Sequence, residues 1–185
     1  MQWTIPGTTL TGEREDAQRV DAVFQALFLA GGLTLSQVAS ISGLEPHTVQ
    51  NWVKRGYLAP PRCKRYNMEQ VCRILNINLL KGALTLEQSC QLISYINGSL
   101  TDESDDLIDD TLLYFFFVRL AARARYFGGT ETWDSALEEV TLSYHEPVPG
   151  AREKLGQVLK IMLTAWLTGR MKAETEQMLS QLKTI

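Results

Sequence analysis

The sequence predicts an all-α fold with at most one short β-hairpin, and three observations support this prediction. Apolar residues recur at steps of three and four through most of the chain, which is the spacing of one face of an α-helix. Glycines and prolines fall between these segments, where helices begin and end. The alternating pattern of strands is scarce, and only residues 57–67 suit a hairpin.

The N-terminal part is expected to hold an arm and one amphipathic helix. Residues 1–12 contain proline and glycines among several threonines and are predicted to form an extended or loose arm. Residues 13–30 repeat apolar side chains at helical spacing, namely Val20, Val23, Phe24, Leu27 and Phe28. Gly31 and Gly32 then end this helix.

Two short helices and two longer ones are predicted in the middle of the chain. Thr34 can cap the first, and Pro46 suits the first turn of the second. The third covers residues 68–81 and is apolar on most sides, so we expect it to be buried. Thr85 and Gln88 resemble a capping box at the start of the fourth.

Three further helices are predicted after an acidic turn, over residues 112–127, 132–144 and 151–182, the last with a break at Gly169. Residues 114–118 are apolar on every side and predict either a core helix or an interface. A second stripe, made of Leu155, Val158, Leu159, Met162, Leu163 and Trp166, favours packing. A hydrophobic effector pocket around Trp166 is the alternative.

The composition is that of a soluble globular protein of one generous domain or two small ones. The chain has 185 residues, of which 45% are hydrophobic and 21% charged. The longest apolar run, residues 112–118, is far shorter than the roughly 20 residues that cross a bilayer. Three cysteines without a C-x-x-C pair indicate neither a disulfide framework nor a zinc ribbon. We therefore expect a cytoplasmic protein with no membrane segment.

The charge is distributed unevenly along the chain. The net charge is −3, but residues 34–73 hold six basic side chains against two acidic ones. The rest of the chain holds 12 basic and 19 acidic side chains. Opposite charge in different segments indicates different tasks, and a basic segment is typical of nucleic-acid binding.

The basic segment coincides with a helix-turn-helix pattern over residues 34–58. This motif needs a short helix, a turn with glycine and a second helix with a polar outer face. Gly43 supplies the turn, while Val49 and Trp52 face inward on a recognition helix over about residues 46–55. The outward residues are His47, Thr48, Gln50, Asn51, Lys54 and Arg55, and the following segment adds Arg62, Lys64, Arg65 and Tyr66.

These side chains suit double-stranded DNA. Gln50 and Asn51 can pair with adenine edges, and Lys54 and Arg55 can contact phosphate or guanine. Basic residues that neutralise phosphates would supply most of the affinity. A solvated polar surface is the alternative interpretation.

From residue 35 to about residue 93 the chain resembles the MerR-like winged helix-turn-helix. The matching positions are Ala39, Gly43, Leu44, Thr48, Trp52, Gly56, Leu58, Pro61 and Tyr66, and residues 84–88 match the start of a later helix. Residues 15–120 also resemble a bacterial family of unknown function, through residues 51–55, 60–61, 64–66, 77–81 and 112–114. The resemblance implies a transcriptional regulator. The chain departs from MerR proteins in having Gln50 and Asn51 where they usually carry arginine and tyrosine, and in its shorter wing.

For the other candidate sites, a structural role is favoured over a chemical one. The aspartates Asp105, Asp106, Asp109 and Asp110 could hold magnesium, but acids also suit the first turns of a helix. Cys63 lies among basic residues and could act as a redox sensor or be incidental, while Cys72 and Cys90 are expected in the core. We expect no metal, no cofactor and no enzymatic activity.

The sequence thus predicts a two-part regulator of transcription. Residues 1–12 form the arm, residues 13–98 the DNA-binding domain, and residues 99–185 an acidic helical domain for dimerisation or effector binding. A homodimer is expected, because one short recognition helix rarely supplies specific affinity alone. Two alternatives remain: an adaptor that binds another protein through the same helices, and a magnesium-dependent enzyme at the aspartates.

Overall fold

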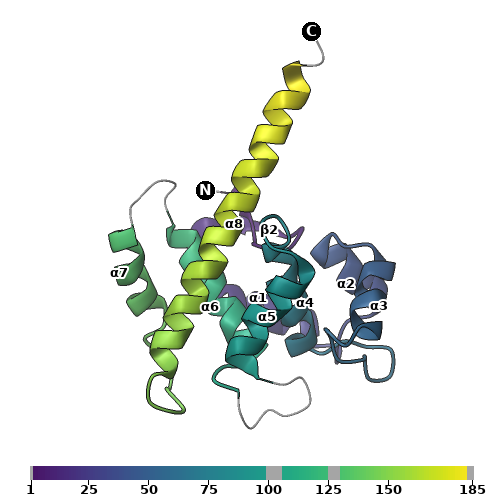
Figure 1. Cartoon of the computed structure of the whole chain (residues 1–185). Coiled ribbons are helices and arrows are strands. Elements are labelled where there is room, and N and C mark those ends of the chain that lie inside the picture. Colours follow the sequence, from purple (N-terminus) through teal and green to yellow (C-terminus); the bar gives the residue numbers. More distant parts are fainter. Residues whose placement is uncertain (1, 99–105, 125–129, 183–185) are drawn as a thin grey trace.

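The computed structural model describes residues 2–98, 106–124 and 130–182 (Figure 1). Helices account for most of these residues, as predicted. A short antiparallel hairpin at the N-terminus and a 3-10 helix precede eight α-helices. The elements are β1 (Gln2–Thr4), β2 (Thr11–Glu13), η1 (Arg14–Arg19), α1 (Val20–Phe28), α2 (Leu35–Ser42), α3 (Pro46–Lys54), α4 (Met68–Leu80), α5 (Leu86–Asn97), α6 (Asp110–Arg123), α7 (Thr130–Val140) and α8 (Ala151–Leu182).

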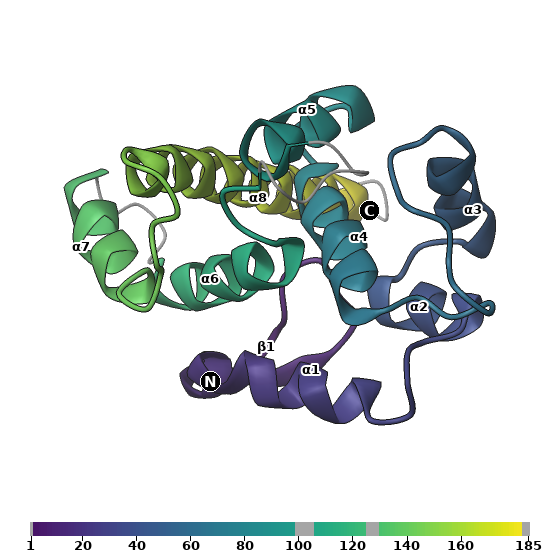
Figure 2. The same ribbon diagram turned by 90° about the horizontal axis from the view of Figure 1, so that it is seen from below.

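Helix α4 lies at the centre of the molecule, between the pair α2 and α3 and the later helices (Figure 2). It packs against α2, α5, α6 and α8, and each of its residues 71–80 is buried. The apolar side chains of all these helices form one core cluster, which runs from Ile5 to Trp166. The boundary predicted between residues 98 and 99 therefore does not divide the hydrophobic core.

The N-terminal arm, which was predicted to be extended or loose, forms a short β-hairpin. β1 and β2 pair with Trp3 opposite Gly12, and Ile5 and Pro6 in the connecting loop are buried. Tyr114 of α6 donates its hydroxyl hydrogen to the carbonyl of Pro6 over 2.8 Å. Each strand has only three residues, which is too short for an alternating pattern to be recognised.

Within residues 57–67, where a short hairpin was predicted, the chain forms two isolated antiparallel bridges and a tight turn over residues 62–65. Arg62 and Arg65 form an isolated bridge, and the Arg65 amide donates to the Arg62 carbonyl over 2.9 Å. Between them, Cys63 and Lys64 have φ angles of 48° and 61°. Two successive left-handed residues are typical of the tightest β-turns. The segment of residues 59–66, which is called the wing below, is therefore very short.

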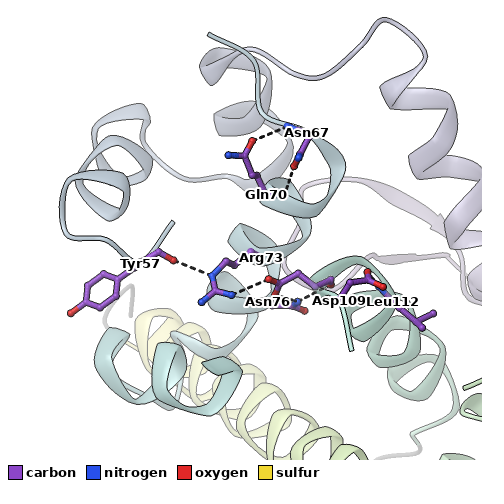
Figure 3. A network of polar contacts seen from close by, with 8 residues as sticks. Tyr57, Asn67, Gln70, Arg73, Asn76, Asp109 and Leu112 are labelled. Carbon is purple, nitrogen blue, oxygen red and sulfur yellow. Dashed lines mark hydrogen bonds and ion pairs between the residues drawn. The ribbon is translucent and has the colours of Figure 1, made fainter. Parts of the chain in front are cut away.

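The helix starts agree with the sequence. Thr34 and Thr85 form capping boxes with Gln37 and Gln88, each accepting from the backbone three residues later. A third box joins Asn67 and Gln70 at the start of α4 (Figure 3), which the sequence analysis missed although the Asn-x-x-Gln pattern was present.

Helix α8 continues unbroken through Gly169, so the predicted break is wrong. A Cβ atom on Gly82 would lie only 2.7 Å from the Cα of Gly169, because the two backbones cross here almost in contact. Beyond this crossing α8 projects from the body (Figure 1), and residues 170–182 are all exposed. Among the described residues no helix is long and apolar enough to cross a membrane.

Candidate nucleic-acid interface

Helix α3 is held by its inner face and by the turn before it. Val49 and Trp52 are buried, as predicted. Pro46 occupies the first helical turn, and Gly43 ends α2 with a φ of 67°, a left-handed conformation that glycine adopts without strain. Thr9 donates its hydroxyl hydrogen to the carbonyl of Ser40 over 2.7 Å and so braces α2 from the N-terminal loop.

The outer face of α3 carries four of the predicted contact residues. His47, Gln50, Asn51 and Lys54 are all exposed, and Thr48 beside them is half-buried. The four exposed residues stand at i, i+3, i+4 and i+7, so they share one face of the helix. α3 packs mainly on α2 and lies at the outer edge of the molecule (Figure 2), which leaves this face free to meet a partner.

Arg55 is engaged within the protein. Its guanidinium lies 2.6 Å from Glu87 of α5 and 4.8 Å from the centre of the Tyr57 ring, and its side chain remains 42% exposed. A backbone hydrogen bond and Arg55 together lower the pKa of Glu87, so this carboxylate stays charged beside the guanidinium. A DNA contact by Arg55 would therefore compete with Glu87.

The wing residues differ in how freely they can reach a partner. Arg62 and Lys64 are exposed on the turn. Arg65 is also exposed but donates from Nη1 to the carbonyl of Gly32 over 2.8 Å. Tyr66 is only 2% exposed, because its backbone pairs with Leu33 and carries the ring inward. The prediction that Tyr66 contacts DNA is therefore wrong.

A buried polar network behind α3 went unrecognised in the sequence (Figure 3). Arg73 of α4 donates from Nη1 to Asp110 of α6 over 3.0 Å and from Nε to the carbonyl of Tyr57 over 3.1 Å. Asn76 donates to the carbonyl and the carboxylate of Asp110 over 3.1 and 3.2 Å. Burial raises the pKa of Asp110, while Arg73 opposes that rise.

This network changes how two sequence features are interpreted. Arg73 counted toward the basic segment, but its charge is neutralised inside the protein and cannot reach a nucleic acid. Asp110 belonged to the acidic cluster, yet it is an internal partner of that arginine. Arg73 and Asp110 are 37 residues apart in the sequence, so a local sequence pattern cannot predict that they form a pair.

The other aspartates of the acidic cluster that the structure describes, Asp106 and Asp109, are not part of a metal site. Asp109 caps α6 by accepting from the amide of Leu112 over 2.8 Å, as acids at a helix start often do (Figure 3). Asp106 lines a pocket of about 510 Å³ beside Arg62, and Asp105 lies outside the described residues. Within residues 2–98, 106–124 and 130–182, no three potential ligands gather to hold a metal ion.

The cysteines and the aromatic segments lie largely as the sequence predicts. Cys72 and Cys90 are buried, and this burial raises the pKa of both thiols, while Cys63 is exposed on the wing. Residues 114–118 belong to the core. Trp166 is buried, with its ring nearly perpendicular to that of Phe117 at 6.0 Å between centroids and with the Arg170 guanidinium 4.9 Å from its ring centre.

Comparison with known proteins yields one match. Neither the curated proteins nor the solved structures contain a match to this chain. A family model matches residues 30–115, which include α2, α3, the wing, α4, α5 and the start of α6. Both members of the Arg73–Asp110 pair fall inside this segment. The matching model is that of DUF1836, a domain of unknown function, so residues 30–115 are similar to that domain.

Proposed function

We infer that the protein binds double-stranded DNA through the outer face of α3, as a regulator of transcription with a MerR-like winged helix-turn-helix. One observation carries this inference: His47, Gln50, Asn51 and Lys54 form one exposed polar face on a peripheral helix whose opposite face is buried. A helix with side chains is about 10–12 Å wide, and the major groove is about 12 Å wide.

The chemistry of this face suits base edges. Gln50 and Asn51 each carry an amide that can pair with adenine through one donor and one acceptor. Lys54, one turn further along, can reach guanine or a backbone phosphate. Lys64 and Arg62 on the wing supply further positive charge for phosphates.

The internal bonds of the arginines limit the electrostatic part of the affinity. Arg73 is buried, and Arg55 and Arg65 already have partners in the protein. About three to five phosphate contacts would give a slope of log affinity against log salt of about −2.7 to −4.5 for each chain. We therefore expect moderate affinity from one copy, and a homodimer would raise it by reading paired half-sites.

A protein-interaction adaptor is the second candidate. Glu87 beside Arg55 and the exposed Glu45 at the start of α3 place negative charge at both ends of the recognition face. Such a mixed surface suits a protein partner with charges of its own. These negative charges at both ends of the exposed face of α3 are the observation that favours a protein partner over DNA.

Selection of bound sequences from a random duplex library, followed by fluorescence anisotropy, distinguishes DNA binding from the adaptor function. DNA binding predicts an enriched motif and a salt-sensitive affinity. A Gln50→Ala/Lys54→Ala variant should lose at least tenfold in affinity, since each good base contact contributes about 1–3 kcal/mol. Arg19→Ala, a change at an exposed cation of η1 outside both α3 and α8, is the matched control and should bind normally. Failure to enrich any motif, or equal binding by the Gln50→Ala/Lys54→Ala variant, refutes the proposal.

A further inference from the structure

One face of α8, from Ile161 to its projecting end, carries an apolar seam that the rest of the described chain does not cover. Exposed residues repeat at alternating steps of three and four over three heptads: Ile161, Thr164, Thr168, Met171, Thr175, Met178 and Leu182. The four apolar members are 48%, 46%, 62% and 68% exposed, in chain order. This α8 seam has the 3.5-residue period of a helix that packs lengthwise against another helix.

The threonines of the α8 seam are apolar toward the outside. Thr164, Thr168 and Thr175 each donate the hydroxyl hydrogen to the carbonyl four residues earlier, over 2.8 to 2.9 Å. With the donors satisfied within the helix, the methyl groups are available for packing. The seam can therefore be buried without leaving these three hydroxyl donors unpaired.

The inner end of the α8 seam continues into a groove between α5 and α8. This groove has a volume of about 420 Å³. It is lined by Leu84, Gln88, Gln91, Leu92, Tyr95, Gln157, Val158 and Ile161. Gln157 precedes Ile161 by four residues, so it extends the heptad spacing into the groove. One helix face thus has a groove at its inner end and an apolar tip, Met178 to Leu182, at its outer end.

We propose that the α8 seam pairs with the α8 seam of a second copy of this chain, in antiparallel orientation. A groove at one end and an apolar tip at the other make the face self-complementary. The two-fold symmetry of such a dimer would seat each tip in the other copy's groove. This inference goes beyond DNA binding and holds whether or not α3 contacts DNA.

The charges beside the seam select one register. We consider the register in which Ile161 of one copy lies opposite Met178 of the other. Along one edge of the seam, Glu174 of one copy then lies beside Leu167 of the other. Along the opposite edge Lys172 lies beside Ala165, so like charges do not meet. Shifting the pairing by one heptad outward places Glu174 against Glu174 and Lys172 against Lys172. In the favoured register, Leu179 of the second copy lies over Val158, inside the groove.

Light scattering of the full chain on a sizing column, from low to high micromolar concentration, tests the dimer without any DNA. The expected mass is twice the 20.8 kDa of one chain. A Met171→Lys/Met178→Lys variant should raise the dissociation constant roughly tenfold or more, because it buries two charges in the seam. Leu29→Lys/Leu142→Lys is the matched control, since these leucines are 86% and 77% exposed and lie outside α8.

Cysteine crosslinking tests the orientation. In a Cys63→Ser background, Ile161→Cys together with Met178→Cys should form a disulfide-linked dimer, while either change alone should not. Crosslinking by Ile161→Cys alone would show a parallel pair and overturn the antiparallel arrangement. A chain that stays monomeric at all concentrations, or a dimer that withstands Met171→Lys/Met178→Lys, would overturn the seam as the dimer interface. Circular dichroism verifies that each variant keeps its helices.

Discussion

Removing either partner of the Arg73–Asp110 pair should destabilise the protein strongly, and the two losses should differ in their pH dependence. Both side chains are only 6% exposed, so neither charge is screened by water. Breaking such a pair by deleting one partner costs about 3–5 kcal/mol. That is a large part of the roughly 5–15 kcal/mol by which a domain of this kind is stable.

The pH dependence follows from the pKa of Asp110. Burial raises this pKa, and the Arg73 guanidinium opposes that rise. In Arg73→Met the carboxyl loses its counter-charge, so its folded pKa rises further above the unfolded value. A group with a raised folded pKa contributes stability that is lost as pH increases through that pKa. Arg73→Met should therefore be least stable at neutral pH and should recover part of its loss on acidification toward pH 5.

Asp110→Asn should behave differently, because it removes the titrating group and leaves Arg73 charged and buried. Its loss of stability should stay nearly constant between pH 5 and pH 7. Arg73→Met/Asp110→Leu, which removes both charges, should lose less than the sum of the single variants, since apolar replacements of buried pairs are often tolerated.

Urea unfolding followed by circular dichroism at pH 5 and pH 7 measures these free energies. Losses under about 1 kcal/mol in both single variants would refute the argument, because that is the value of an exposed pair. Equal pH dependence in Arg73→Met and Asp110→Asn would refute the assigned role of Asp110. A Glu87→Gln variant at the exposed Arg55 pair is the internal control and should change stability little.

Three other predictions concern local contacts. Gly82→Ala should lower the melting temperature, because its Cβ would strike the Gly169 backbone, whereas Gly169→Ala should lose less, since alanine favours a helix interior by about 1 kcal/mol over glycine. Thr34→Ala should cost about 1 kcal/mol in the free energy of urea unfolding by removing the cap of α2. Glu87→Gln should increase the affinity for DNA and steepen its salt dependence in anisotropy titrations, because the change releases Arg55. An unchanged slope of log affinity against log salt would show that Arg55 makes no phosphate contact.

Local signals were sufficient for most helices and for the exposed face of α3. The caps at Thr34 and Thr85 depend only on residues within one turn, so a short pattern predicts them. Val49 and Trp52 were placed inward by helical spacing alone, and that same spacing placed Gln50 and Lys54 outward.

Several of the failures depend on partners far away in the chain. Gly169 looked like a helix break, but its hydrogen atom makes room for Gly82 from an earlier connection. Tyr66 looked like a contact residue, but its pairing with Leu33 turns it into the core. Asp110 looked like one acid among four, and only the folded chain brings Arg73 to it.

Helix α4 connects the exposed face of α3 with the α8 seam through closely packed contacts. Its Arg73 holds the Tyr57 carbonyl just after α3 and, with the same guanidinium, the first turn of α6. Its other faces pack against α6 and α8, and α8 carries the α8 seam. Because α4 is buried along residues 71–80, a shift of α8 in a dimer cannot be absorbed without repacking. The separation of two α3 helices would therefore be fixed by the pairing of α8, and with it the spacing of the half-sites that a dimer reads.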